Sequence, residues 1–166
     1  MATPAYMKLK GQKSGDVKGS VKVKGREDSI EVIAFNHEVR MPTDPQTGRL
    51  AGVRRHEPIV VTKAFDKSSP ILYQMACTGE LITDLNIDWY EIKPDGKEAI
   101  WYKHTLKNAQ ITSIRAVMPN LKVGESRDRA AANVAYEEVS FMYGSISWEV
   151  VEGGIMATDD WQQTRD

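Results

Sequence analysis

The sequence predicts a mainly β protein, built as a two-sheet β-barrel or sandwich with one short flanking α-helix and a long extended loop. Apolar and polar residues alternate in several of the patterned segments, as they do in half-buried strands. Only residues 69–78 combine helical apolar spacing with start and stop signals. Residues 40–58 follow neither period and contain three prolines and four arginines, so we expect them to form the long loop.

Length and composition set broad limits on the protein. Its 166 residues suit one domain, which we place at 1–151 with a C-terminal tail at 152–166, and such a domain needs no disulfide to be stable. The single cysteine, Cys77, lies in an apolar stretch and is expected to be a buried, unreactive thiol. Lys and Arg (22) nearly balance Asp and Glu (23), which argues against a nucleic-acid partner. No stretch is apolar enough for stable membrane insertion.

The first part of the chain predicts three strands and two irregular segments. Residues 5–10 are expected to form a short strand, and the β-rich stretches at 29–39 and 58–66 two more. Residues 11–28 contain four glycines and many lysines, which favours a loop or a loosely paired ribbon. Their basic excess is either a solvated face or a patch for an acidic partner. The segment at 40–58 is longer than most loops, and such loops are usually functional or disordered.

One short helix is predicted in the middle of the chain. Ser69 is the expected N-cap, Pro70 suits the first helical position, and Gly79 suits a left-handed cap at the end. The apolar stripe between these signals consists of Ile71, Leu72, Met75 and Ala76. A helix of about ten residues is unstable alone in water, so this stripe must pack against a preformed sheet. We therefore expect Ile71, Leu72 and Met75 to face inward.

The remaining sequence is expected to be strands and turns. The expected segments are a half-buried strand at 80–92, a hairpin turn at 93–97, one long strand or two at 98–119, a polar loop at 120–131 and a final strand or hairpin at 133–151. Asp95-Gly96 is the turn signal, and Gly144 is expected at a bulge or bend. The tail at 152–166 has no period and is expected to be mobile, or ordered only by a neighbour.

No catalytic, cofactor-binding or metal-binding constellation emerges from the sequence. His37, His56 and His104 lie far apart without metal-ligand spacing, and phosphate-binding, dinucleotide-binding and nucleophile-elbow motifs are missing. Two alternatives to a purely structural protein stay open. A carbohydrate- or small-ligand-binding module would use tryptophans from the strands, and a hydrolase would use a pair of carboxylates. The residues concerned are Trp89, Trp101 and Trp148 for the first and Asp84 and Asp88 for the second.

Several segments resemble the Hcp family, the tube-forming proteins of type VI secretion systems. The most specific is EPIVVTKAFDKSSPILYQMACTGE at 57–80, in which a strand leads through DKSSP into the helix. ATPAYMKLKG, ITSIRAVMPN, YEEVSFMYGSISWEV and GGIMATDDW resemble the family's N-terminal strand, later strands and C-terminal segment. The resemblance covers nearly the whole chain. An extended loop and edge strands also suit a subunit that contacts its neighbours.

The resemblance implies a small barrel of two sheets, a homohexameric ring with a central channel, and rings stacked into a tube. It implies spike, sheath and baseplate proteins as partners, and small effector proteins carried in the lumen. Such a protein would be made in the bacterial cytoplasm and secreted without a signal peptide. No cofactor is implied.

The resemblance also assigns candidate residues. The loop at 40–58 would reach the adjacent ring or subunit, and Asn36 is the candidate for a side chain facing the lumen. The candidates for ion pairs and hydrogen bonds across the loop contact are Arg40, Asp44, Arg49, Arg54 and Arg55. The helix would cover the sheet, with Ser69, Pro70, Ile71, Leu72 and Met75 as its packing residues.

Overall fold

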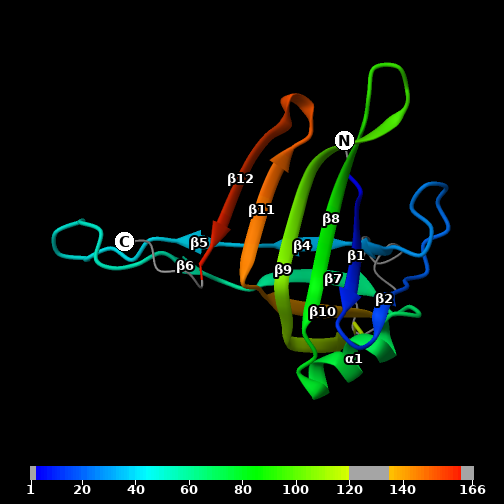
Figure 1. The fold of residues 1–166 in the computed structure, drawn as a ribbon, viewed down its shortest axis with the longest axis horizontal. Coiled ribbons are helices and arrows are strands. Elements are labelled where there is room, and N and C mark those ends of the chain that lie inside the picture. Colours follow the sequence, from blue (N-terminus) through cyan, green and yellow to red (C-terminus); the bar gives the residue numbers. More distant parts are fainter. Residues whose placement is uncertain (1–2, 120–134, 162–166) are drawn as a thin grey trace.

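The computed structural model describes residues 3–119 and 135–161, and it is mainly antiparallel β-structure with one α-helix. One layer contains β1 (Ala5–Gly11), β2 (Gly15–Val17), β3 (Ile30–Val32), β8 (Ile82–Ile92), β9 (Glu98–Val117), β11 (Ser145–Val150) and β12 (Ile155–Asp160). The second contains β4 (Ala34–Asn36), β7 (Ile59–Ala64), β10 (Tyr136–Met142) and the end of β9. Figure 1 shows the helix α1 (Ser69–Thr78) beside the ends of both layers. The predicted fold class is confirmed.

Strand β9 joins the two layers and is one strand of 20 residues. Its residues 98–109 pair with β8, and its residues 110–117 pair with β10. Asn108 lies near this change of partner with a φ of 50°, a left-handed conformation that asparagine tolerates better than most residues. The Gly144 amide donates to the carbonyls of Lys107 and Asn108 at 3.0 and 3.1 Å, so the β10–β11 turn is fastened to the same point.

The stretch at 29–39, which we expected to be one strand, is divided between the layers. Its first part, β3, pairs with β1, and its second part, β4, pairs with β7. Between them the Ile33 amide donates to the Thr62 carbonyl at 2.8 Å. Ile30 is fully buried whereas Ala34 is exposed, so the regular alternation that predicted a single half-buried strand does not hold.

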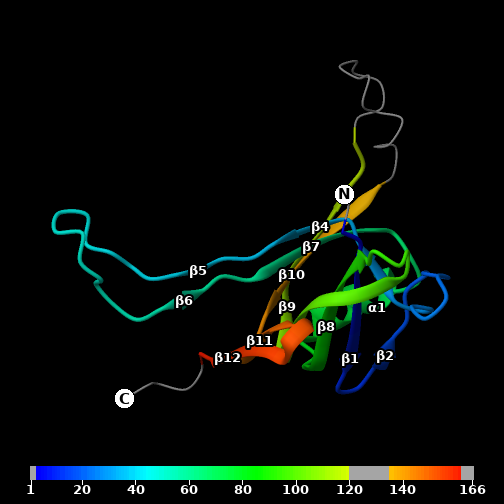
Figure 2. The same cartoon turned by 90° about the horizontal axis from the view of Figure 1, so that it is seen from above.

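The expected loop at 40–58 is an extended hairpin, which we call the arm (residues 37–57). It contains the two-residue strands β5 (Val39–Arg40) and β6 (Arg55–His56), which pair with each other, and an isolated bridge between Thr43 and Leu50. Figures 1 and 2 show the arm projecting far from the two layers. A two-stranded hairpin is at best marginally stable in water, so the arm depends on its attachment at the base.

Two further expectations differ from the structure. Residues 152–166 were expected to be a tail, but the described part forms a 3₁₀ turn, η1 (Glu152–Gly154), followed by β12, which pairs with all six residues of β11. Cys77 is exposed, not buried, because it lies on the helix face opposite Leu72 and Met75.

The loop expected at 120–131 lies outside the described residues. The hairpin turn at 93–97 is present, with Gly96 at a φ of 78°. No helix in the described ranges is long and apolar enough to cross a membrane.

The start of α1 is set by a buried polar cluster that explains the DKSSP block. Ser68 is the N-cap, not Ser69, and its side chain makes no capping bond. Ser68 instead bonds to the Asp66 carboxylate, which also accepts the Ser68 amide at 2.9 Å. Ser69 Oγ accepts from the Asp66 amide at 3.0 Å and donates to Glu137 Oε1. The block therefore fixes a tight turn between β7 and the helix.

Lys63 lies at the centre of this cluster. It is fully buried, as is Glu137, and its ammonium group lies 3.0 Å from Asp66 and 3.3 Å from Glu137. It also donates to Ser69 Oγ at 3.1 Å and to the Ala64 carbonyl at 3.0 Å. A buried ion pair is costly to desolvate, and removing one partner leaves the other charge buried without compensation. On the other side of the helix start, Leu72 and Met75 are buried in the core and the partly buried Ile71 packs against it.

We predict that Lys63→Met lowers the free energy of unfolding by about 3–5 kcal/mol, because Glu137 is left as a buried, unpaired charge. The double variant Lys63→Met/Glu137→Leu should recover most of that loss. Urea denaturation measures both, with the exposed Lys67→Met as a control that changes stability by less than about 0.5 kcal/mol. A loss for Lys63→Met no larger than for the control would contradict this account of the cluster.

Candidate interaction site on the arm

The tip of the arm is a turn organised by Asp44. Its carboxylate accepts the Gln46 amide at 2.8 Å and the Thr47 hydroxyl at 3.0 Å, and its carbonyl accepts the Gly48 amide at 2.8 Å. The Gln46 amide is the main reason that the pKa of Asp44 lies below its usual value. Asp44, one of the residues predicted to contact another subunit, is thus used to shape the tip.

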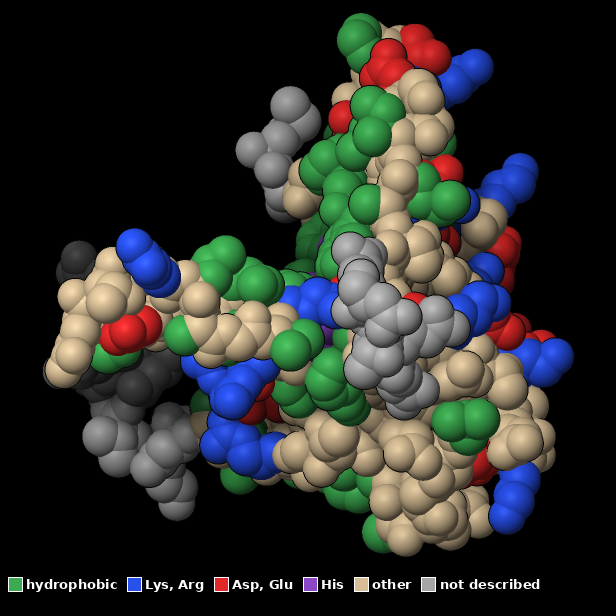
Figure 3. Space-filling model, turned by 60° about the vertical axis from the view of Figure 1, so that its left-hand side comes forward, with side chains coloured by type: hydrophobic (Ala, Val, Ile, Leu, Met, Phe, Trp, Pro, Cys, Tyr) green, Lys and Arg blue, Asp and Glu red, His purple; other side chains and the backbone are tan. Residues whose placement is uncertain are grey.

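The outer part of the arm presents cationic and apolar side chains together. Arg40 pairs with Glu57 of the same chain at 3.1 Å. Arg49 and Arg55 are exposed and form no ion pair within residues 3–119 and 135–161. Figure 3 shows arginine side chains on the arm beside hydrophobic ones. The exposed apolar side chains include Met41, Leu50 and Val53, at 45, 67 and 74% of full exposure.

A recess on the arm is lined by residues that include Arg40 and Arg55. It has a volume of about 350 Å³ and is lined by Arg40, Met41, Pro42, Thr43 and Arg55. Because Arg55 lines this recess and forms no ion pair within the described residues, its guanidinium could pair with a carboxylate carried on another protein surface. The arm therefore exposes both charged and apolar side chains that a partner surface could cover.

Arg54 behaves differently from the other arginines, because it points back to its own chain. Its Nε donates to Asp159 Oδ2 at 2.5 Å, and a second guanidinium nitrogen donates to the Asp160 carbonyl at 3.1 Å. Both acceptors belong to β12, the strand that we expected to be a tail. Hydrogen bonding from Arg54 is the largest reason that the pKa of Asp159 lies below its usual value.

Two histidines complete the attachment of the arm. His56 Nε2 lies 2.7 Å from Asp159 Oδ2, and its Nδ1 lies 2.6 Å from the hydroxyl of Tyr143. His37 Nε2, on the other strand of the arm base, lies 2.8 Å from the same hydroxyl. Trp148 stacks on both imidazoles, with ring centroids 6.4 and 6.5 Å away. We call these linked groups, His37, Tyr143, His56, Asp159 and Arg54, the base network.

Few features of the sequence point to the base network. Its histidines lie 19 positions apart in the sequence, so ligand spacing could not reveal them. Tyr143 and Asp159 meet them only because β11 and β12 run back beside the arm base. Burial lowers the pKa of His37 and raises that of Tyr143, which fits neutral rings that exchange hydrogen bonds.

Asn36, the candidate for a lumen-facing residue, is exposed on β4, opposite Val60 of β7. Its neighbour Phe35 turns to the other side and packs edge-on against Trp89, with ring centroids 5.2 Å apart. Phe35 also contacts His104 at 4.8 Å. The backbone of β4 is thus held by aromatic packing, and Asn36 is left on the open face.

The tryptophans proposed for a sugar platform are not all together. Trp89 and Trp101 line one recess of about 270 Å³ with Tyr102 and His104, whereas Trp148 stacks on the histidines of the base network. The Trp89 indole donates to His104 Nδ1 at 2.9 Å, so the indole nitrogen already has a hydrogen-bond partner within the chain. A platform of three tryptophans is therefore not formed.

The two carboxylates proposed for a hydrolase each have a lysine nearby. Asp84 forms an ion pair with Lys107, and Asp88 lies near Lys103 and Lys8, although burial raises its pKa. The two carboxylates are thus placed beside different lysines and do not form a pair with each other. Within the described residues, no group of three or more His, Cys, Asp or Glu side chains is arranged to hold a metal ion.

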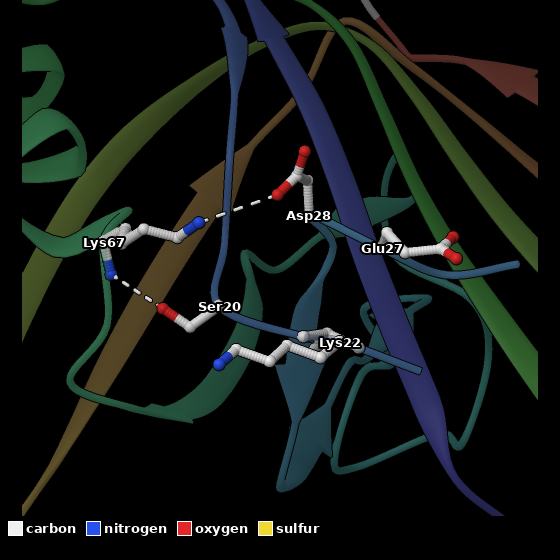
Figure 4. A pocket seen from close by; sticks show the side chains of 6 residues that line it. Ser20, Lys22, Glu27, Asp28 and Lys67 are labelled. Atoms are coloured by element: carbon white, nitrogen blue, oxygen red, sulfur yellow. Dashed lines mark hydrogen bonds and ion pairs between the residues drawn. The ribbon is translucent and has the colours of Figure 1, made fainter. Parts of the chain in front are cut away.

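The basic N-terminal stretch contributes to a pocket of mixed charge. Figure 4 shows Lys67 pointing at Asp28 and Lys22 beside them. Lys67 lies 3.6 Å and Lys18 3.5 Å from Asp28, and the Lys67 amide donates to Ser20 Oγ at 3.2 Å. Because Asp28 offsets these lysines, the pocket is not a strong site for an anionic ligand.

Comparison with known proteins identifies relatives along nearly the whole chain. The sequence pattern of the family described as "Type VI secretion system effector, Hcp" matches residues 6–150. The chain is 38% identical to the "Major exported protein" of Pseudomonas aeruginosa, over 98% of this chain and 97% of that protein.

Solved structures agree with this result. The Hcp1 protein from the E. coli EAEC 042 pathovar is 36% identical, with a TM-score of 0.85 over 96% of this chain and 99% of that one. The secreted protein Hcp3 from Pseudomonas aeruginosa is 32% identical, with a TM-score of 0.78 over 98% of this chain and 100% of that one.

We predict that the His104 ring stays neutral down to strongly acidic pH. Burial, with a smaller contribution from His37, lowers its pKa to about 4. Since the unfolded chain binds this proton at higher pH, the contribution of His104 to stability falls as pH drops from 6.5 towards 4. NMR titration of the imidazole protons should give a midpoint near 4, and Trp89→Phe should raise it by removing a bond to the neutral ring. A midpoint near the ordinary histidine value would contradict the prediction.

Proposed function

This chain belongs to the Hcp family of type VI secretion proteins, and on that premise we propose that it is the structural subunit of a secretion tube. Six copies form a ring around a channel, and rings stack into the tube. The observation that carries the proposal is the arm, whose exposed apolar and cationic side chains call for a partner outside the chain. In this proposal the arm of one subunit lies against the next ring, where Leu50 and Val53, which are exposed in the single chain, become buried.

Magnitudes indicate which arm contacts matter most. Burying a Leu or Val side chain contributes about 1.5–3 kcal/mol, whereas an exposed ion pair contributes about 0–1 kcal/mol. Leu50 and Val53 therefore supply most of the stacking free energy of each arm, and Arg49 and Arg55 set its orientation on acidic side chains of the neighbour. Repetition around a ring multiplies these small contributions.

The other partners follow from the same proposal. The tube is assembled in the bacterial cytoplasm with sheath, baseplate and spike proteins, and is then exported. Small effector proteins travel in the channel, where Asn36 presents a polar side chain to them. The name of the Pseudomonas relative, an exported protein, is consistent with this route. The proposed role is structural and needs no cofactor.

The first test concerns assembly. Wild-type protein at micromolar concentration should give hexamers by native mass spectrometry and stacked annuli by negative-stain microscopy. Leu50→Asp/Val53→Asp should keep the rings and lose the stacks, because a buried carboxylate costs more than the contact provides. The conservative Leu50→Met/Val53→Ile is the matched control and should keep the stacks. A strictly monomeric wild type would contradict the tube function, and long tubes from the Asp variant would contradict the role of the arm.

The second test concerns the channel. Asn36→Arg should reduce the recovery of co-purified small effector proteins several-fold without changing ring mass, because it adds a bulky charge to the channel wall. Asn36→Ser keeps a small polar side chain and should bind like wild type. Equal recovery with Asn36→Arg would exclude a luminal Asn36.

A further inference from the structure

The base network is a directed chain of hydrogen bonds that links both strands of the arm to β12. Asp159 is an acceptor, so His56 Nε2 carries the hydrogen between them at 2.7 Å. A neutral His56 then accepts at Nδ1 from the Tyr143 hydroxyl at 2.6 Å. The hydroxyl oxygen in turn accepts from His37 Nε2–H at 2.8 Å. Each of these three contacts therefore has one donor and one acceptor.

This row of hydrogen bonds accommodates a limited number of protons. Between His37 and His56 there are two gaps, one on each side of the Tyr143 hydroxyl, and each holds one hydrogen. If one histidine becomes an imidazolium, the hydroxyl hydrogen can still turn to the other. If both become imidazolium ions, both ring nitrogens and the Tyr143 hydroxyl carry a hydrogen, so three hydrogens must fit into two contacts. Two positively charged rings then also lie on either side of one hydroxyl.

Residues of β9, β11 and β12 surround the base network. Arg54 is a permanent cation bonded to Asp159 and to the Asp160 carbonyl. On β11, Trp148 covers both imidazoles, and the Trp161 indole donates to the Tyr143 carbonyl at 2.5 Å. On β9, His104 lies close enough to His37 for His37 to contribute to its lowered pKa. Among these named neighbours, Asp159 is the acidic side chain bonded directly to the network.

We propose that the base network is a proton-sensitive latch, which holds the arm base on the Tyr143 hydroxyl when at most one of its histidines is an imidazolium and releases it from that hydroxyl when both are. Without the Tyr143 contacts the arm keeps fewer side-chain bonds at its base, and a two-stranded hairpin does not hold one direction by itself. If the chain forms tubes as proposed above, release also weakens ring stacking in acid, and this consequence alone rests on the proposed function.

The direction of the pH effect follows from two groups. Burial lowers the pKa of His37 in the latched state, so a released His37 binds its proton more readily, and falling pH below 6.5 favours release. The pKa of Asp159 is also lowered when latched, chiefly by Arg54, so acid favours release through this group too, as pH falls towards and below its ordinary value of 3.8. The contact between His56 and Asp159 has the opposite sign, because an imidazolium is attracted to the carboxylate, and release requires that the crowding at the Tyr143 hydroxyl outweigh it.

Distances between two spin labels, measured by double electron–electron resonance, test the latch in the full chain. Cys77 is exposed on α1 and takes one label, and Gln46→Cys at the arm tip takes the other. Labelled protein is mixed with an excess of unlabelled protein, so that only distances within one chain are measured. The wild-type network should give one narrow distribution at neutral pH and a distribution at least about twofold broader near pH 5, where exposed histidines are protonated.

Variants separate the latch from general unfolding. His37→Phe keeps an aromatic ring against Trp148 but removes the third hydrogen, so its distribution should stay narrow in acid. Asp159→Asn should be broad at both pH values, and Arg54→Gln carries the same prediction if that variant does not fold. Arg55→Gln, on the arm but outside the network, is the matched control and should behave like wild type.

Each result decides the proposal. A wild-type distribution that stays narrow near pH 5 with native circular dichroism would overturn it, as would a His37→Phe protein that broadens in acid like the wild type. Normal latching in a protein that never forms rings would leave the latch standing and overturn only the tube function.

Discussion

The arm has no core of its own, and this constraint determines much of the structure around it. A hairpin with two short pairings cannot hold a direction in water. Its orientation therefore depends on Arg54 and His56, which bond to Asp159 of β12. The segment that was expected to be a tail instead supports the arm. A projection fixed in this way loses less conformational entropy when another subunit binds it.

A second buried polar cluster has a comparable role at the other end of the molecule. Lys63, Asp66, Ser69 and Glu137 fix the turn from β7 into α1, so that Leu72 and Met75 enter the core at a defined angle. Both clusters use charge to specify geometry where apolar packing alone would allow alternatives. Replacing both partners of such a buried pair costs little stability, whereas an arrangement that separates them leaves an unpaired buried charge and is penalised.

Local patterns in the sequence predicted the strands, the helix and the tight turn at Asp95-Gly96, because these depend on neighbours a few positions away. They did not predict the N-cap, since Ser69 is drawn into bonds with the distant Glu137 and leaves Ser68 at the cap position. They also missed β12, whose residues are exposed except near its end and therefore show no alternation. At the arm, composition identified the arginines, but only the fold shows that Arg54 turns inward while Arg49 and Arg55 stay exposed.

The most direct test of the central claim is a cryo-electron microscopy structure of the assembled protein. The account predicts stacked hexameric rings in which the tip of each arm lies in density of the next ring, with Leu50 and Val53 covered and Arg54 still on Asp159 of its own chain. Arms that extend into solvent within an intact tube, or an Arg54 that reaches another subunit, would contradict it.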